Sequence, residues 1–150
     1  MEKFRELGLD GDILKGIADL GFETPSPVQE KAIPVILGEE NDLVVLAQTG
    51  TGKTAAFGLP LLQKINPEWN NVQILVLSPT RELCMQIGND LKNYSKYLPD
   101  IRVTCVYGGT DIRRQMKELQ KGVHVVVATP GRSVDLLNRK ALNIETVFAV

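Results

Sequence analysis

The sequence predicts an α/β fold in which helices cover both faces of a mainly parallel sheet. Short apolar runs rich in β-branched residues recur at 43–47, 73–78 and 123–128. They are continuous rather than alternating, as in strands buried on both faces. Segments with helical spacing lie between them, and such alternation is typical of parallel sheets with right-handed crossovers and ligands at the carboxyl ends of the strands.

Weaker signals complete this set of elements. Residues 101–107 and 146–150 are expected to add two further strands. The polar stretch 66–71 predicts a surface loop, in which Trp69 is interpreted as an anchor packed on its own domain rather than as a base-stacking platform. Helix boundary signals, with four starts and one stop, stand at Ser26-Pro27, Thr80, Thr110-Asp111, Thr129-Pro130 and Gly122.

Composition excludes several classes of protein. The chain has 150 residues, of which 43% are hydrophobic, enough for one domain with a core. Its apolar runs are far shorter than the roughly 18 residues that span a bilayer, so no membrane partner is expected. The N-terminus lacks the apolar core of a signal peptide, which favours a cytoplasmic location.

The charge and the cysteine content indicate neither a strongly basic nucleic-acid-binding domain nor a disulfide-bonded protein. The formal net charge is −1 and the pI is near 5.9, so any nucleic-acid contact must be local. Cys84 and Cys105 are widely spaced among apolar residues, which favours reduced core thiols over a metal site or a disulfide.

A glycine-rich loop joins the first predicted strand to a predicted helix. Glycines let backbone N–H groups close around phosphate oxygens, and the helix N-terminus adds a positive dipole end. Lys53 would reach the β/γ phosphates and Thr54 would ligate Mg²⁺, which makes both the predicted catalytic residues. The alternative is a glycine turn with a solvated lysine. The predicted nucleotide-binding loop is Ala47, Gln48, Thr49, Gly50, Thr51, Gly52, Lys53 and Thr54, with Ala47 where the pattern usually has glycine.

Upstream, residues 21–29 read Gly-Phe-Glu-Thr-Pro-Ser-Pro-Val-Gln, and Phe4 precedes Gly21 by seventeen positions. This segment resembles the Q motif of DEAD-box RNA helicases, in which the glutamine amide binds the adenine edge and an aromatic residue packs on the base. The resemblance implies these roles for Gln29 and Phe22, and hence selectivity for ATP. Alternatively, Ser26 and Gln29 form a capping box, and Phe22 is a core aromatic residue.

Three further segments resemble RNA-binding motifs of the same family. They are motif Ia in residues 79–86, the GG motif, and motif Ib in residues 129–132. Each follows a predicted strand, where helix N-termini and free backbone N–H groups can bind phosphates of single-stranded or duplex RNA without reading its sequence. The alternative treats them as ordinary caps and solvated charges. The implied RNA-binding residues are Pro79, Thr80, Arg81, Glu82, Gly108, Gly109, Thr129, Pro130, Gly131 and Arg132.

Other positions between and beyond these motifs also resemble the family. Gln115, Leu119 and Gly122 do so between the GG motif and motif Ib, as do residues 135–137 beyond it. His124 stands where the family often has an acidic residue, and we interpret it as a substitution at a strand edge.

The resemblance implies a three-layer RecA-like P-loop domain of which residues 1–150 are the first part. Residues 147–150 resemble the strand that leads into the Asp-Glu-Ala-Asp motif, so the sheet should be incomplete at its C-terminal side, with residues 43–47 and 146–150 flanking a gap. The parent protein would be an ATP-dependent RNA helicase that remodels RNA duplexes or RNA–protein complexes, with a second RecA-like domain as partner. Residues 1–150 alone should bind ATP and RNA weakly without turnover. The alternative is a noncatalytic nucleotide- or RNA-binding module.

Overall fold

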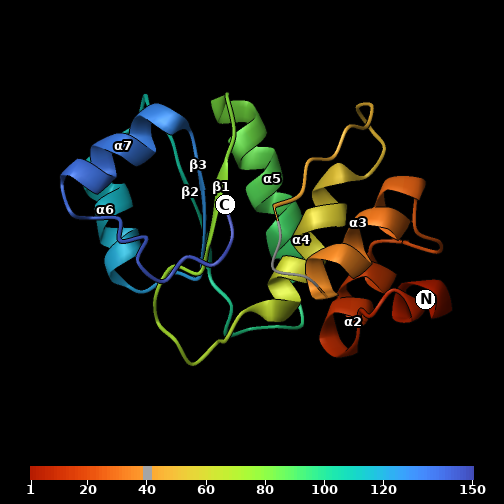
Figure 1. Cartoon of the computed structure of the whole chain (residues 1–150). Helices are drawn as coiled ribbons and strands as arrows, with labels where there is room; N and C mark the ends of the chain where they lie inside the picture. Colours follow the sequence, from red (N-terminus) through yellow and green to blue (C-terminus); the bar gives the residue numbers. More distant parts are fainter. Residues whose placement is uncertain (39–41) are drawn as a thin grey trace. The chain divides into compact units, whose positions relative to one another are not determined.

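The structure, a computed structural model, describes residues 1–38 and 42–150. These residues group into two compact units (Figure 1). Unit 1 comprises Met1–Lys64 and Asn93–Pro99, and unit 2 comprises Ile65–Lys92 and Asp100–Val150. The helical first unit carries the glycine-rich loop, and the second carries the sheet.

Unit 1 is built from helices whose apolar sides form its core. They are α1 (Glu2–Glu6), α2 (Gly11–Asp19), α3 (Pro27–Gly38) and α4 (Lys53–Lys64). Burying these side chains is the main favourable contribution to folding of the unit. Its fully buried side chains include Phe4, Leu9, Ile17, Ile33 and Leu59.

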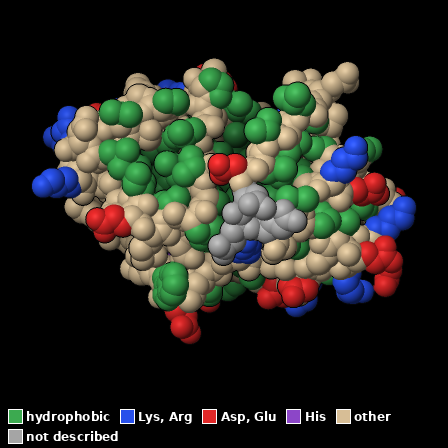
Figure 2. All heavy atoms as spheres, viewed as in Figure 1, with side chains coloured by type: hydrophobic (Ala, Val, Ile, Leu, Met, Phe, Trp, Pro, Cys, Tyr) green, Lys and Arg blue, Asp and Glu red, His purple; other side chains and the backbone are tan. Residues whose placement is uncertain are grey.

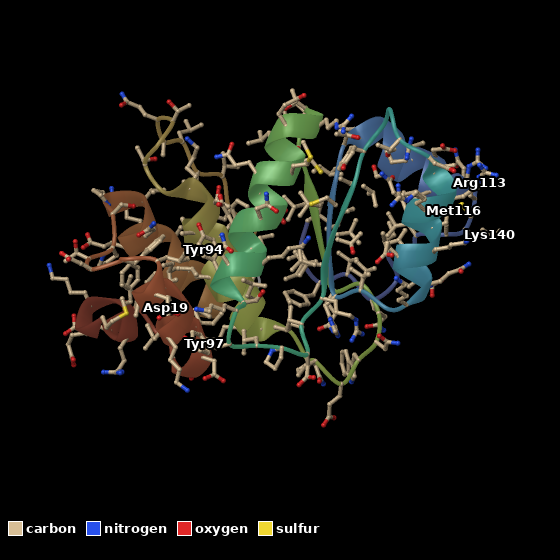
Figure 3. All side chains as sticks on the ribbon, turned by 180° about the vertical axis from the view of Figure 1, so that it is seen from behind. Asp19, Tyr94, Tyr97, Arg113, Met116 and Lys140 are labelled. Carbon is tan, nitrogen blue, oxygen red and sulfur yellow. The ribbon has the colours of Figure 1, made fainter. Side chains whose placement is uncertain are left out.

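The segment Asn93–Pro99 is fastened to α2 by its aromatic and charged side chains. Lys96 Nζ and Tyr97 Oη both donate hydrogen bonds to Asp19 Oδ2, the second at 2.8 Å (Figure 3). These two donors, Lys96 first, lower the pKa of the Asp19 carboxyl. At Gly16, a β-carbon would lie 2.5 Å from the carbonyl oxygen of Tyr94. Glycine at this position therefore lets the backbones approach closely.

Unit 2 contains a parallel sheet in the order β1-β3-β2. Its strands are β1 (Ile74–Leu77), β2 (Val103–Val106) and β3 (Val125–Ala128). Leu77 and Val106 both stand opposite Ala128, so the carboxyl ends of the strands coincide. The central strand, β3, is buried throughout, as its continuous apolar sequence predicts.

Helices cover both faces of this sheet (Figure 1). On one face, α6 (Ile112–Gln120) and α7 (Pro130–Asn138) pack through Met116 and Leu136 on a cluster that includes Val126. On the other face lies α5 (Arg81–Tyr94), where the Cys84 thiol donates to the carbonyl of Val127 at 3.2 Å. The predicted three-layer α/β arrangement is therefore confirmed.

The predicted strand at residues 43–47 is wrong, and the one at 146–150 is reduced to a single bridge. Residues 43–47 have no regular secondary structure, and Val44 and Leu46 are 86% and 94% exposed. Ala149 alone bridges Ile74. A strand needs a neighbour for its backbone groups, and residues 43–47 have no strand partner among the described residues; the expected gap beside them stays a prediction. Figure 2 shows hydrophobic side chains reaching the surface in both units.

The loop at residues 66–71 is held by a buried glutamine rather than by its tryptophan. Trp69 is 59% exposed, so the expectation that it anchors the loop is wrong. Gln73 is 2% exposed, and its side-chain amide accepts from Asn66 N and donates to the carbonyls of Asn66 and Trp69. A buried amide with these partners fixes the turn.

Helix boundaries follow most of the predicted signals. Asp111 caps α6 by accepting from Arg113 N at 2.9 Å, and Thr80 Oγ1 accepts from Leu83 N at 3.2 Å. Gly122 follows α6 with φ +87°, a left-handed conformation that favours glycine. Thr129 precedes α7 as expected, although its side chain makes no capping hydrogen bond.

His124 is fully buried just before the central strand, which corrects its interpretation as a strand-edge substitution. Its Nδ1 accepts from Arg102 N at 3.0 Å, so Nε2 carries the proton and donates to the carbonyl of Pro67 at 3.2 Å. Both ring nitrogens of the neutral imidazole are thereby satisfied. A second proton on Nδ1 would face the N–H of Arg102.

The buried imidazole should make stability depend on pH. Burial first, and the Arg102 charge second, lower the pKa of His124 from 6.5. The unfolded state therefore binds the proton more readily. The free energy of unfolding should fall as pH drops below about 6.5, by at most about 1.4 kcal/mol per pH unit. Urea unfolding at a series of pH values between about 8 and about 5 measures this slope.

His124→Asn is the control, because its Oδ1 can still accept from Arg102 N. The variant should be less stable at high pH but should lose most of the slope near pH 6.5. An unchanged slope would assign the pH dependence to other groups, since His124 is the only histidine in the chain.

Candidate nucleotide and nucleic-acid sites

The glycine-rich loop leads directly into α4, as predicted. Gly50 and Gly52 have φ of +75° and +84°, which L side chains rarely adopt. Helix α4 begins at Lys53, and Ala56 N donates to the carbonyl of Gly52 at 3.0 Å. The loop and helix N-terminus therefore have the backbone arrangement that suits an anion.

Lys53 folds over this loop. Its ammonium donates to the carbonyl oxygens of Ala47, at 2.6 Å, and Gln48. Thr51 Oγ1 also donates to the Gln48 carbonyl at 2.8 Å. Lys53 is half-buried, so it is not the freely solvated lysine of the alternative interpretation. Its present acceptors are neutral carbonyls, and phosphate oxygens would be stronger acceptors for the same donor.

Gln29 connects α3 to the loop. Its Oε1 accepts from Ser26 N at 2.9 Å, and its Nε2 donates to the carbonyl of Gly52 at 3.2 Å. Ser26 Oγ donates to the carbonyl of Thr51 at 2.8 Å. The first contact is half of a capping box, and the other two hold the loop against α3. One N–H and one lone pair of the Gln29 amide remain for another partner, although the side chain is only 4% exposed.

Phe22 lies between two aromatic rings of unit 1. Its centroid is 6.1 Å from that of Phe4 and 6.0 Å from that of Tyr94, the latter pair being edge-on. The ring is half-buried, so it acts as a core aromatic on these sides. Its contact with a base remains a prediction.

The three predicted RNA motifs of unit 2 lie at one edge of the sheet. Because the ends of β1, β3 and β2 are in register, residues 78–82, 129–132 and 107–110 all leave the sheet at its carboxyl edge. Most of the predicted residues there are exposed, whereas Thr129 and Arg132 are half-buried. This edge presents the N-termini of α5 and α7 and a left-handed Gly109 with φ +80°.

The two arginines at this edge are held by protein contacts. The Arg81 guanidinium lies 4.9 Å from the centroid of the Tyr107 ring, a cation–π distance. Arg132 donates from Nη1 to Gln115 Oε1 at 2.7 Å and from Nη2 to the Thr110 carbonyl at 3.1 Å. Tyr107 and Thr110 were missed from sequence, since only their position before a helix could have suggested them.

The two cysteines lie behind this edge and are both free. Cys105 Sγ donates to the Cys84 carbonyl at 3.6 Å. The adjacent Cys84 side chain, with a smaller contribution from the charge of Lys92, lowers the pKa of Cys105 to about 7 despite burial. The prediction of thiols without a disulfide agrees with this arrangement.

Two kinds of site are absent from the part of the chain that the structure describes. Residues 1–38 and 42–150 contain no group of three or more His, Cys, Asp or Glu side chains that could hold a metal ion. Within the same residues, no helix has both the length and the apolar character needed to cross a membrane. A metal at the loop would therefore depend on Thr54, in the first turn of α4, and on groups other than such a cluster.

Comparison with known proteins places these features in one family. The family model described as DEAD/DEAH box helicase matches residues 26–149. The chain is 51% identical over 147 residues to the ATP-dependent RNA helicase CshA of Listeria monocytogenes, covering 98% of the chain and 28% of that protein. It is 46% identical to the DEAD-box ATP-dependent RNA helicase CshA of Geobacillus kaustophilus, covering all of the chain and 32% of that protein. The chain thus spans less than a third of the length of these relatives.

Solved structures agree with the fold. Dbp5 of S. cerevisiae, bound to RNA and ADP BeF3, superposes with a TM-score of 0.87 at 34% identity, over 98% of this chain and 37% of that one. A DEAD box protein from the hyperthermophile Methanococcus jannaschii gives a TM-score of 0.88 at 38% identity, over 97% and 39%. The RecA-like fold predicted from sequence is confirmed.

The contact between Gln29 and Gly52 can be tested with two matched alanine variants. Gly50→Ala and Gly52→Ala both place a β-carbon on left-handed backbone, at a cost of about 1–2 kcal/mol. Only at Gly52 would that carbon overlap Gln29 Nε2, whereas Gly50 has open space. Gly52→Ala should therefore lower the free energy of unfolding by about 0.5–1.5 kcal/mol more than Gly50→Ala does, because the Gln29 amide would turn aside and lose its hydrogen bond to the Gly52 carbonyl. Denaturant unfolding measures both, and equal losses would contradict a tight contact.

Proposed function

Because this chain belongs to the DEAD/DEAH box helicase family, we propose that it forms the ATP-binding part of an ATP-dependent RNA helicase. The observation that carries the proposal is the Gln29–Gly52–Lys53 arrangement, in which the Q-motif glutamine and the loop lysine meet on one glycine-rich loop. The relatives named as ATP-dependent RNA helicases support the same activity.

In this proposal the loop binds the phosphates of ATP. Backbone N–H groups of residues 50–54 and the N-terminus of α4 surround the phosphate oxygens, and Lys53 exchanges loop carbonyls for the β/γ phosphates. Bound Mg²⁺ would neutralise charge on the phosphates, with the Thr54 hydroxyl as its ligand from this chain. Gln29 uses its remaining N–H and lone pair for the adenine edge, beside Phe22.

RNA binds, in this proposal, at the carboxyl edge of the sheet in unit 2. The Gly108–Gly109 turn and the first turns of α5 and α7, which follow Thr80 and Thr129, offer backbone N–H groups, while Arg81 and Arg132 supply charge. Such contacts do not read bases, so binding is largely independent of sequence. The structure of the related Dbp5 with RNA is in keeping with this role.

In this proposal, turnover also needs the Asp-Glu-Ala-Asp motif, which the resemblance places after residues 147–150. We therefore assign these residues weak ATP and RNA binding. Hydrolysis and the remodelling of RNA duplexes belong to a cytoplasmic parent protein with a second RecA-like domain. Absence of RNA-stimulated ATPase activity in that parent would favour the noncatalytic binding module instead.

Lys53→Ala tests the phosphate loop in the full-length protein that carries this sequence. A hydrogen bond to a charged group contributes about 1.5–3 kcal/mol, so ATP affinity should fall at least about tenfold, and hydrolysis should be abolished. Equilibrium binding of labelled ATP and phosphate release measure the two effects. Lys3→Ala removes the same charge from an exposed site on α1 and should change neither. Retained ATPase activity in Lys53→Ala would refute the assignment.

Gln29→Glu separates adenine recognition from helix capping. Glutamate can still accept from Ser26 N, as capping boxes do, but it cannot donate as the amide Nε2 does. The preference for ATP over GTP should fall, and the melting temperature should fall as well, because a carboxylate oxygen would face the Gly52 carbonyl in place of the donor Nε2. Competition binding with the two nucleotides measures that preference. If the preference is retained, Gln29 serves only to cap α3 and hold the loop.

A further inference from the structure

Gln115 is the buried centre of the carboxyl edge, and neither the RNA motifs nor the nucleotide loop includes it. It lies on α6 and is 9% exposed. Its Nε2 donates to the carbonyl of Tyr107 at 3.1 Å and to Thr110 Oγ1 at 2.8 Å, and its Oε1 accepts from Arg132 Nη1 at 2.7 Å. One side chain therefore connects the strand end before the GG motif to the arginine of motif Ib.

The same hydrogen bonds fix the orientation of Arg132. Its guanidinium spans Gln115 Oε1 and the Thr110 carbonyl through two different nitrogens. A guanidinium has five N–H donors in a planar fork, so two such contacts set its plane and leave three donors for a ligand. Without Gln115, one of the two anchoring contacts disappears and the half-buried arginine loses a defined direction.

The network continues to the other RNA motif. Tyr107, whose carbonyl Gln115 holds, places its ring against Arg81. Thr110 Oγ1 donates to the same Tyr107 carbonyl at 3.3 Å, closing the turn that contains Gly108 and Gly109. Buried polar groups linked in this way stabilise one arrangement of the edge.

We propose that Gln115 is a positioning residue for RNA binding, which holds Arg132 and the Gly108–Gly109 turn in the geometry that contacts phosphates. This rests on the proposed function of the edge. Gln115 does not contact RNA itself but acts through Arg132 and the turn. For Arg132 to be held in this way, the side chain needs the planar guanidinium that reaches two acceptors, as well as its charge.

The test uses the full-length protein and its affinity for single-stranded RNA of two unrelated sequences over a range of salt concentrations. Gln115→Met keeps the length of the side chain without its hydrogen bonds. It should weaken RNA binding roughly tenfold for both sequences. The slope of log affinity against log salt concentration should also become shallower by about one, the value for one lost phosphate contact, although no charge has been removed. ATP affinity should stay unchanged. Gln120→Met, an exposed glutamine on the same helix, is the matched control and should match the wild type.

Two further variants show whether Gln115 acts through Arg132. The double variant Gln115→Met/Arg132→Ala should bind RNA more weakly than Arg132→Ala, but by less than the full loss seen in Gln115→Met, because the part of that loss that acts through Arg132 is already gone. Arg132→Lys keeps the charge but cannot span two acceptors, so it should lose nearly as much affinity as Arg132→Ala. This result does not depend on how well Gln115→Met folds.

The outcomes distinguish the inference from the proposed function. Wild-type affinity and salt dependence in Gln115→Met, additive losses in the double variant, or full affinity in Arg132→Lys would each overturn the role of Gln115. These outcomes count against Gln115 alone, and not against the RNA site, if Arg81→Ala and Arg132→Ala still weaken RNA binding. If neither arginine variant changes RNA affinity, the edge is not the RNA site and the proposed function fails first.

Discussion

The in-register parallel pairing of β1, β3 and β2 is the constraint on which the arrangement of unit 2 depends. Leu77 and Val106 stand opposite Ala128, so all three strands end at the same level. The chain turns there into α5, toward α6 and into α7, which brings together residues that are distant in sequence. A shift of one residue in either pairing would turn the strand's side chains to the opposite face. The buried Leu75–Val126 layer under Leu136 opposes such a shift.

In unit 1, order at the glycine-rich loop comes from polar contacts with α3 and from its own carbonyls. Gln29 and Ser26 hold the loop from one side, and Lys53 holds two of its carbonyls from the other. In all of these hydrogen bonds the acceptor is a backbone carbonyl of the loop. They therefore define the path of the loop independently of most of its side chains. Gly52 is the exception, because any β-carbon there would displace Gln29.

Buried amides and one imidazole perform similar work in unit 2. Gln73 fixes the loop at residues 66–71, His124 fixes the entry to β3, and Gln115 fixes the exit from β2. Each has hydrogen-bonding partners that offset the cost of burial. Gln73 and His124 bond to backbone groups, and Gln115 bonds to the Tyr107 carbonyl and two side chains, so each specifies loop geometry where apolar packing alone would leave several arrangements of similar energy. The exposed edge at residues 107–110 is therefore supported from within.

The sequence by itself determined the α/β class, the three strands of unit 2, the loop-to-helix step at Lys53 and the family resemblance. These follow from local hydrophobic periodicity, glycine placement and cap residues. It could not decide whether residues 43–47 form a strand, because pairing requires a neighbour that periodicity does not reveal. Nor could it show that His124 is buried, that Trp69 is exposed, or that Gln115 joins Tyr107 to Arg132. Those contacts link residues eight and seventeen positions apart, and only the tertiary structure sets which side chains meet, because the register of the sheet and the packing of α6 and α7 bring them together.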